Sequence, residues 1–221
     1  MAEINIRGDI ISNDDKWIYN WFEWDSTCPN DVKEAIEANP EGERLTVLIN
    51  SPGGSVFAGQ EIYSMLHERE DVDIKIQSIA GSAASVIAMA NHSEMSPVAM
   101  IMIHNVQIRG ASGDYHDMKK NAEVLQQMNE ALAASYVAKT GRDQDEILKL
   151  MDRETWLTAN QALELGFVDA IEGDAAEFAA NISGMRLTEE MRQKAIAEKA
   201  KADEIKAQKD EILKDLDSYG I

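Results

Sequence analysis

Two short runs of small and polar residues could carry chemistry, because each follows an apolar run and precedes a helical pattern. The first, Asn50-Ser51-Pro52-Gly53-Gly54-Ser55, follows the apolar residues Leu45–Ile49. Glycines lack side chains, so a ligand's backbone can approach the N–H groups of such a loop closely. The loop predicts either an oxyanion donor and strand-docking ledge or a tight strand–helix turn. It lacks the Gly-Lys-Ser/Thr ending of a phosphate-binding loop.

The second run, Gly81-Ser82-Ala83-Ala84-Ser85-Val86, lies between a predicted strand and a predicted helix. Its small residues allow a sharp turn that leaves the Ser85 hydroxyl accessible at the start of the helix. That is the setting of a serine nucleophile, although the Gly-x-Ser-x-Gly spelling is absent. In this arrangement the Val86 N–H points toward the charge that develops beside Ser85. The alternative is that Ser85 only caps the helix.

One of the four histidines is placed to act as a general base. His104 follows the apolar run Met100–Ile103, at the end of a predicted strand, where sites assemble in open α/β sheets. Beside a nucleophile from a neighbouring strand end, it can take the nucleophile's proton. A carboxylate that orients this histidine must come from the segment Asp152–Ala159, and the residues alone leave Asp152 and Glu154 both open.

The alternation of β-rich runs and helical patterns through residues 1–172 predicts right-handed βαβ units and an α/β fold. The predicted strands are Ile4–Ile6 with Ile10–Ile11 after a turn at Gly8–Asp9, Leu45–Ile49, Asp73–Ile79 and Met100–Ile103. The predicted helices are Asp31–Ala38, Ala58–Leu66, one starting at Ser85, and a long one over Tyr115–Lys139 that ends at Gly141. We expect one domain over 1–185. Residues 186–221 predict a helical tail, either a weak coiled coil or scaffold-contacting arm, or a solvated single helix.

Composition excludes several classes of protein. The chain has 221 residues with 44% apolar content, enough for a full core. Its formal net charge of −19 argues against a nucleic-acid binder. A single cysteine, Cys28, excludes an internal disulfide and a cysteine-cluster metal site. No apolar run is long enough to span a bilayer, and no secretory signal opens the chain, so we expect a cytoplasmic protein.

In combination, the motifs occur in the order of the ClpP family of serine peptidases, which the sequence resembles from about Ile4 to Ile171. The motifs are Ile49–Gly54, Gly81–Ser85, Met102–His104, and Thr158–Ala159 with Gly166–Asp169. The resemblance implies a crotonase-like fold of repeated ββα units, with Tyr115–Lys139 as the handle helix that joins two rings. It also implies that no metal, nucleotide or other cofactor is required.

The resemblance assigns roles to individual residues. Ser85 becomes the nucleophile and His104 the base, and the N–H groups of Gly54 and Val86 hold the oxyanion. The family's acid lies two residues before an aromatic residue and five before the alanine, a spacing that falls on Glu154. Asp152 is the alternative. The substrate is expected to pair as an added strand with Gly53, Gly54, Ser55 and Val56.

Three departures from the housekeeping enzyme resemble the ClpP-related head-maturation proteases of tailed phages and prophages. The chain begins almost at its first strand, residues 154–158 read Glu-Thr-Trp-Leu-Thr, and a helical tail follows Gly184. This resemblance implies ATPase-independent cleavage of scaffold or capsid proteins, in the host cytoplasm or inside a prohead. It implies a homo-oligomeric ring, heptameric as in the family, and no docking of an unfoldase.

Three other functions compete with this interpretation. The chain could be a housekeeping ClpP subunit that works with an unfoldase, or a catalytically weak pseudo-peptidase that acts as an assembly adaptor. Acyl-CoA enzymes of the crotonase type share the fold, but they have no use for a serine after Gly-x-Ala-Ala together with a strand-end histidine. Labelling by a fluorophosphonate separates a serine peptidase from the acyl-CoA class.

Overall fold

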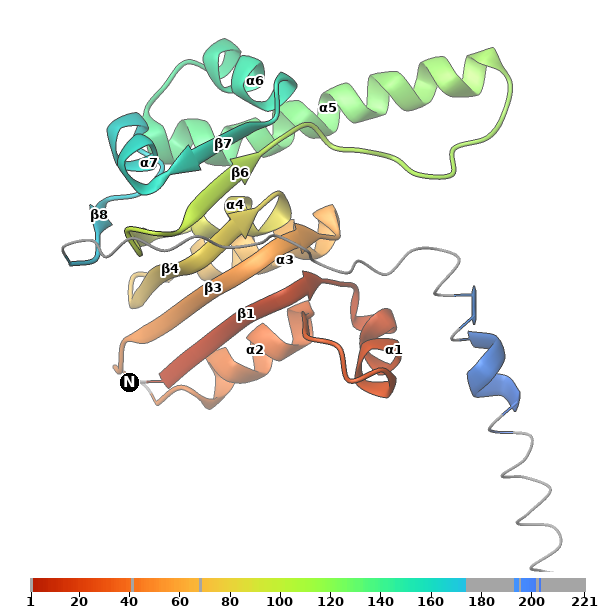
Figure 1. The fold of residues 1–221 in the computed structure, drawn as a ribbon, viewed down its shortest axis with the longest axis horizontal. Helices are drawn as coiled ribbons and strands as arrows, with labels where there is room; N and C mark the ends of the chain where they lie inside the picture. The colour runs from red at the N-terminus through yellow and green to blue at the C-terminus, as the bar shows by residue number, and fades with distance from the viewer. Residues whose placement is uncertain are drawn as a thin grey trace, which may run out of the picture.

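The computed structural model describes residues 2–40, 42–67, 69–173, 193–194, 196–201 and 203. Within these residues, helices pack around one eight-stranded sheet (Figure 1). The strands are β1 (Ala2–Ile10), β2 (Ser26–Thr27), β3 (Leu45–Gly54), β4 (Val72–Gly81), β5 (His92–Met95), β6 (Met100–Ile103), β7 (Thr155–Thr158) and β8 (Ala170–Ile171). The helices are a 3-10 turn (Asn13–Asp15), α1 (Lys16–Trp21), α2 (Pro29–Ala38), α3 (Val56–His67), α4 (Ala83–Ala88), α5 (Tyr115–Thr140), α6 (Gln144–Asp152) and α7 (Ala159–Leu165).

The sheet is parallel except at one pair of strands, and the predicted α/β class is confirmed. Its strand order is β2-β1-β3-β4-β5-β8, and β6 pairs with β4 and with β7. Only β6 and β7 run antiparallel to each other. In Figure 1, α2, α3 and α4 lie behind β1, β3 and β4, whereas α5, α6 and α7 gather beside β6 and β7. Strand, helix and parallel strand therefore alternate as the sequence predicts.

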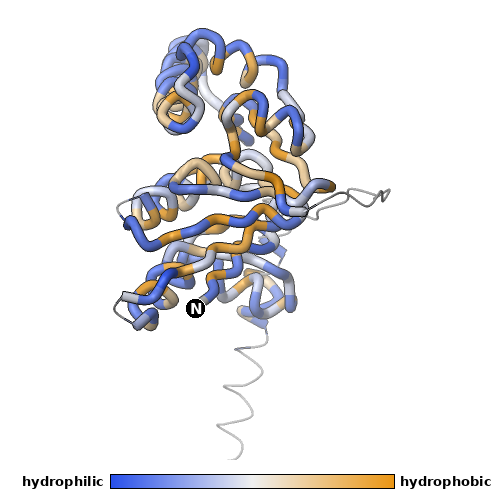
Figure 2. The backbone as a smooth tube through the Cα atoms, turned by 90° about the vertical axis from the view of Figure 1, so that its left-hand side faces the viewer, coloured by the Kyte–Doolittle hydropathy of each residue, from blue (hydrophilic) through white to orange (hydrophobic). Residues whose placement is uncertain are grey.

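Apolar residues from alternate positions of the central strands form the core. Along β3 the odd-numbered residues from Leu45 to Gly53 are buried and the even-numbered ones are less so, as the period of two in a strand requires. Figure 2 shows hydrophobic residues concentrated in the central strands and on the inner sides of the helices. One face of β3 is therefore buried against the helices along the whole strand.

The predicted turn at Gly8–Asp9 is wrong. Residues 2–10 form one strand, and the pairing of β1 with β3 shifts register between Arg7 and Asp9. Gly8 has φ 62° at this bulge, a conformation that glycine adopts without steric cost. Strand β1 therefore continues beyond the bulge and stays paired with β3 up to Ile10, which lies opposite Gly54.

The strand β4 is shared by two neighbours. Its first half pairs with β5 from Asp73 to Ile76, and its second half pairs with β6 from Ile79 to Gly81. The chain after α4 therefore leaves the sheet at the end of β5 and re-enters beside the end of β4. This places the carboxyl end of β6 next to that of β4, which is where the two candidate motifs lie.

The long helix was predicted correctly. It spans Tyr115–Thr140, with Asp114 accepting from the His116 and Asp117 N–H groups at one end and Gly141 in the left-handed conformation at the other. Figure 1 shows the helix extending beyond the sheet, with the loop after β6 running beside it to its far end. Only its second half contributes buried residues, namely Leu132, Ala133, Ser135 and Tyr136.

Part of the predicted tail is described. Residues 193–194, 196–201 and 203 are helical, and the Lys199 Nζ lies 4.6 Å from the centre of the Trp17 ring and 5.5 Å from that of Trp21. The rest of 186–221 lies outside the described residues, so the domain boundary near 185 stays a prediction. No helix in the described part of the chain is long and apolar enough to cross a membrane.

The bulge in β1 gives a test of the fold. A Cβ at Gly8 would lie 1.9 Å from the Asp25 carbonyl oxygen, whereas one at Gly42, also with positive φ, would meet nothing within 4 Å. In both Gly8→Ala and Gly42→Ala the new alanine must adopt the left-handed backbone conformation, which costs about 1–2 kcal/mol. Gly8→Ala also forces the backbone apart, which adds about 1–3 kcal/mol. We expect urea unfolding to show a clearly larger loss of stability for Gly8→Ala than for Gly42→Ala, and equal losses would contradict the bulge.

Candidate active site

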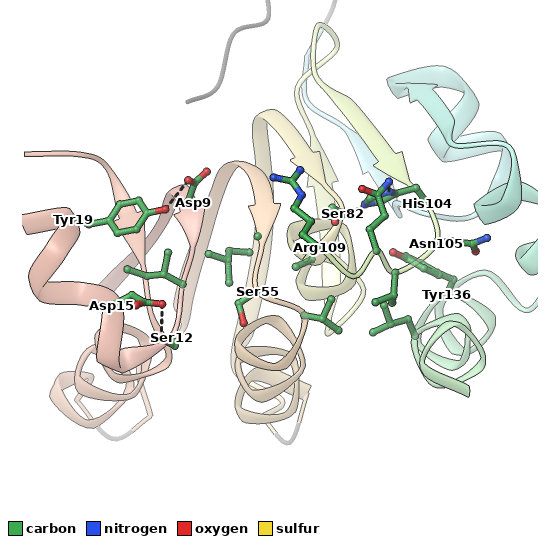
Figure 3. Close-up of a pocket in the computed structure, with 18 residues that line it drawn as sticks. Asp9, Ser12, Asp15, Tyr19, Ser55, Ser82, His104, Asn105, Arg109 and Tyr136 are labelled. Carbon is green, nitrogen blue, oxygen red and sulfur yellow. Dashed lines mark hydrogen bonds between the residues drawn. The ribbon is translucent and has the colours of Figure 1, made fainter. Parts of the chain in front are cut away.

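The carboxyl ends of β1, β3, β4 and β6 meet at one cavity of about 400 Å³. The register pairs Asp9 with Gly53 and Ser51 with Ala80, so Gly53 lies next to the residue that follows β4, Ser82. Both Ser82 and His104 line the cavity (Figure 3). Ligands in open α/β sheets bind at this edge, so the cavity is the candidate site.

Ser82 and His104 form the central contact of the cavity. The His104 Nε2 lies 2.7 Å from the Ser82 Oγ. Two backbone features set this distance, because the Ser82 N–H donates to the Met102 carbonyl at 2.8 Å and Gly81 pairs with Met102. Ser82 has φ 52° and ψ −122°, values that an L residue adopts only under strain. Its side chain is thereby presented to a histidine at a turn between strand and helix.

The structure places Ser85 beside Ser82 rather than against His104. The helix α4 begins at Ala83 rather than at Ser85, so Ser85 lies inside its first turn, and all six residues of α4 are buried. The Ser85 Oγ donates to the Ser82 carbonyl at 2.6 Å and lies 2.8 Å from the Tyr136 hydroxyl. Both of these partners line the cavity. The role of Ser85 as the nucleophile stays a prediction.

The two candidate carboxylates lie on either side of the turn from α6 into β7. The Asp152 Oδ1 accepts from the Asn105 Nδ2 at 2.8 Å. Glu154 has φ 50°, and it follows Arg153 and precedes a strand whose last pair with β6 is Thr155 with Ile103. If the ladder is continued by one residue on each strand, Glu154 comes opposite His104. Opposed residues of antiparallel strands share a face.

The His104 ring and the Glu154 carboxylate each have a polar side-chain neighbour. The Gln107 Nε2 lies 3.4 Å from the His104 Nδ1, so the ring has a polar neighbour on the side away from Ser82. The Trp156 Nε1 donates to the Glu154 Oε1 at 3.3 Å. The structure thus puts an amide beside the outer edge of the imidazole, whereas the Glu154 carboxylate contacts an indole.

The two predicted oxyanion donors lie at different distances from the cavity. The Val86 N–H is directed at the Ser82 carbonyl at 3.4 Å, behind the residues that line the cavity, and its predicted role stays a prediction. Gly54 lines the cavity. A Cβ at Gly53 would lie 2.7 Å from the Ser82 Cβ and 2.9 Å from the Ala83 nitrogen. The residue that follows Ser82 therefore has its N–H beside the glycine loop.

The predicted substrate ledge borders the same cavity. Gly54, Ser55 and Val56 line the cavity, and Gly53 lies close against Ser82. At the far end, Asp9 accepts from the Tyr19 hydroxyl at 2.8 Å and Asp15 accepts from the Ser12 Oγ at 2.9 Å. Figure 3 shows both pairs at one end and His104 with Tyr136 at the other. The cavity therefore extends from the Ser82–His104 contact to an acidic end near α1.

Sequence reasoning did not single out Ser82 as a neighbour of His104, although a signal was present. The run Ala83–Ala88 has no polar residue except Ser85, a composition typical of a fully buried helix. The serine directly before such a helix is the one that lines the cavity in this structure. Among the described residues, no three His, Cys, Asp or Glu side chains come together as a metal site.

Comparison with known proteins identifies the family. The profile of the family described as Clp protease matches residues 32–174, a segment that contains Ser85, His104 and Glu154. The chain is 31% identical over 141 residues to the ATP-dependent Clp protease proteolytic subunit 1 of Chlamydia muridarum and of Chlamydia trachomatis. Each match covers 62% of this chain and 73% of the relative. The chain therefore belongs to the Clp protease family.

Proposed function

We propose that the protein is a serine endopeptidase whose nucleophile is Ser85 and whose general base is His104. The observation that carries this proposal is that the turn from β4 into α4, which holds Ser85, meets the carboxyl end of β6, which holds His104, at the wall of an open cavity. The Ser85 Oγ contacts two residues that line this cavity, Ser82 and Tyr136. A nucleophile and a base that come from neighbouring strand ends are typical of nucleophilic catalysis. Membership of the Clp protease family supports serine peptidase activity.

The chemistry follows the serine triad. Once the Ser85 hydroxyl turns from the Ser82 carbonyl toward the ring, His104 takes its proton as the oxygen attacks the scissile carbonyl, and later returns the proton to the leaving amine. Glu154 accepts from the Nδ1–H, which keeps the proton off Nε2 in the resting enzyme and stabilises the imidazolium that forms. Glutamate reaches one methylene further than aspartate, which suits a residue that sits beyond the last pair of the β6–β7 ladder.

The N–H groups of Gly54 and Val86 form the oxyanion hole in this proposal. Val86 follows Ser85 in the first turn of α4, and its N–H makes only a 3.4 Å contact with the Ser82 carbonyl. The Ser55 N–H donates to the Ile10 carbonyl of β1 at 2.7 Å. Successive N–H groups of an extended chain point to opposite sides, so that of Gly54 points away from β1. Removal of one such donor costs about 10²–10³ in rate.

Substrate binds along the glycine loop in this proposal. Gly53, Gly54, Ser55 and Val56 pair with an extended peptide as an added strand, whose main-chain hydrogen bonds hold it beside the turn that carries Ser85. The register of β1 with β3 at Ile10 and Gly54 keeps this segment extended. The residues of the cavity beyond it then contact the side chains of the substrate.

We assign scaffold and capsid proteins of a phage or prophage as the substrates, cleaved without an ATPase. The support is the sequence Glu-Thr-Trp-Leu-Thr at residues 154–158 and the segment 186–221, both of which resemble head-maturation proteases. A second candidate is a subunit that works with an unfoldase, which the ATP-dependent chlamydial relatives favour. Cleavage of unfolded protein without ATP separates the two candidates.

The enzyme works as a homo-oligomeric ring, heptameric by resemblance to the family. In the first half of α5, Met118 and Val124 are 39% and 44% exposed. Val124, Met128 and Leu132 follow one another at four-residue spacing, and Met118 lies about two turns before Leu125 on the same helix. An apolar row that leaves its own domain needs another surface to cover it. A second subunit of the ring supplies that surface.

Replacement of the nucleophile tests the proposed function. Ser85→Ala should abolish both cleavage of unfolded casein, assayed without ATP, and labelling by a fluorophosphonate, because it removes the hydroxyl that attacks the scissile carbonyl. Ser64→Ala, an exposed serine of α3, is the control and should behave as the wild type. Turnover that survives Ser85→Ala would remove Ser85 from the mechanism.

Replacement of each carboxylate tests the third member of the triad. Glu154→Gln should lower kcat by about 10⁴, the loss typical of an orienting acid. Asp152→Asn should do far less, because Asp152 is engaged with Asn105 at 2.8 Å. Steady-state kinetics on one peptide substrate give the ranking. If Asp152→Asn proves the more damaging change, Asp152 takes the role.

The exposed row of α5 tests the assembly. Met118→Lys with Val124→Lys places two charges in the proposed interface and should convert the ring to smaller species in sedimentation. Gln127→Lys adds the same charge to an exposed polar position of the same helix and should leave the mass unchanged. A double variant that keeps the wild-type mass would show that another surface holds the ring.

A further inference from the structure

Three of the four tryptophans of the chain lie close together in sequence, in and just after α1. Trp24 packs within its own segment, since it stacks on Phe22 and meets the Tyr19 ring edge-on. Trp17 and Trp21, in contrast, are 37% and 48% exposed. They are four residues apart on the helix, so their rings lie on one face of α1. The proposed mechanism does not use this tryptophan face.

One side chain of the tail contacts both rings of the tryptophan face. The Lys199 Nζ lies over the Trp17 ring at 4.6 Å from its centre and over the Trp21 ring at 5.5 Å. Both distances fall within the range of about 6 Å over which the face of an aromatic ring attracts a cation. Figure 1 shows the described tail helix beside α1, on the side away from α2. The contact therefore joins segments from opposite ends of the sequence.

The burial of the tail shows that the lysine directs this contact. Of the described tail residues, 193–194, 196–201 and 203, Lys199 alone is partly buried and all the others are exposed. The exposed residues include Ile196, at 41%. A helix that docks through an apolar stripe buries its isoleucine and leaves its lysines in solvent. The described part of the tail does the reverse, as recognition of a cation requires.

The charges around α1 favour a cationic partner. Acidic residues flank the helix in sequence, namely Asp14, Asp15, Glu23 and Asp25, and an excess of one charge attracts the opposite charge to a surface. The lysine of α1 itself does not compete for the two rings. The Lys16 Nζ is held by the Asp31 carboxylate at 2.7 Å and by the Ser26 carbonyl at 3.0 Å. These contacts also fix α1 against β2 and α2.

We propose that the tryptophan face of α1 is a docking surface for the tail helix of the same chain, which is recognised through the Lys199 ammonium. Two residues of this region, Asp15 and Tyr19, line the acidic end of the substrate cavity. Docking on the outer face of α1 therefore holds the tail next to that end of the cavity. The inference goes beyond the proposed function and does not depend on it.

Hydrogen exchange of the tail tests the docking in the full chain. The exchange rate of the amides of residues 196–201 reports how often the tail helix opens, and a docked helix opens less often. Lys199→Met keeps most of the apolar stem and removes the charge, whereas Lys199→Arg keeps the charge. Lys201→Met is the matched control, because Lys201 is exposed and residues two apart on a helix face different directions.

We expect Lys199→Met to raise the exchange rate about two- to fivefold, the effect of a cation–π contact at an exposed site. Lys199→Arg should exchange as slowly as the wild type, and so should Lys201→Met. Wild-type exchange in Lys199→Met would show that the charge does not hold the tail. Equal acceleration in Lys199→Met and Lys201→Met would show a general attraction to the acidic chain instead of a site, and would equally overturn the proposal.

The rings are tested in the same assay. Trp17→Leu should raise the exchange rate of the tail more than Trp21→Leu, because the Trp17 ring is nearer to the Lys199 Nζ. Addition of both changes to Lys199→Met should raise the rate no further, because all three side chains act through one contact. Trp156→Leu is the matched control, since Trp156 is also 37% exposed but lies on β7, and it should leave the tail unchanged.

Mixed assemblies separate docking within one chain from docking on a second copy. The Lys199→Met chain would be co-expressed with a Trp17→Leu/Trp21→Leu chain, so that one keeps the rings and the other keeps the lysine. Docking within one chain leaves both tails with fast exchange, which is the expected result. Slow exchange of the tails that keep Lys199 would show that they dock on a neighbouring copy, and would overturn the proposed occupant.

Discussion

The close approach of β3 and β4 at Gly53 and Ser82 is the constraint on which the site depends. A Cβ at Gly53 would lie 2.5 Å from the Gly81 carbonyl oxygen and 2.7 Å from the Ser82 Cβ, so only glycine permits the two strand ends to meet. A Cβ at Gly81 would in turn lie 2.9 Å from the Pro52 carbonyl oxygen, so Gly81 also leaves room only for a glycine. Because the contact joins backbone to backbone, it holds the glycine loop and the strained serine in one fixed relation, which a rigid catalytic geometry requires.

The division of β4 between two neighbours sets the position of His104. A four-residue β6 that paired with β4 from Asp73 onward would end opposite Ile76 and would not reach Gly81. Instead β5 occupies the first half, and β6 pairs only with Ile79–Gly81, so that the chain leaves β6 at the level of Ser82. The antiparallel strand β7 then returns beside β6 and brings Glu154 one step beyond the pair of Ile103 with Thr155. The positions of His104 and Glu154 therefore follow from pairing register rather than from neighbouring positions in sequence.

The sequence was sufficient to predict the order of elements, the strand-end position of His104, and the long helix capped by Gly141. It was not sufficient to predict that Ser82, rather than Ser85, lies beside His104, because both serines lie in one run of small residues and their positions depend on where α4 begins. The start of a helix that is buried on all sides carries no amphipathic signal, so that boundary cannot be read from the pattern. Gly8 was misjudged for a related reason, since a glycine with positive φ serves a bulge as well as a turn.

The two serines of this turn show how surroundings separate side chains of identical chemistry. The Ser85 hydroxyl donates to the Ser82 carbonyl and lies 2.8 Å from the Tyr136 hydroxyl, inside a buried helix. The Ser82 hydroxyl lies beside the His104 nitrogen at the wall of the cavity. A serine attacks a carbonyl only when its proton can pass to a group that changes its charge, as an imidazole can and a backbone carbonyl cannot. Which of the two hydroxyls meets His104 therefore depends on the conformation of the short turn that joins β4 to α4.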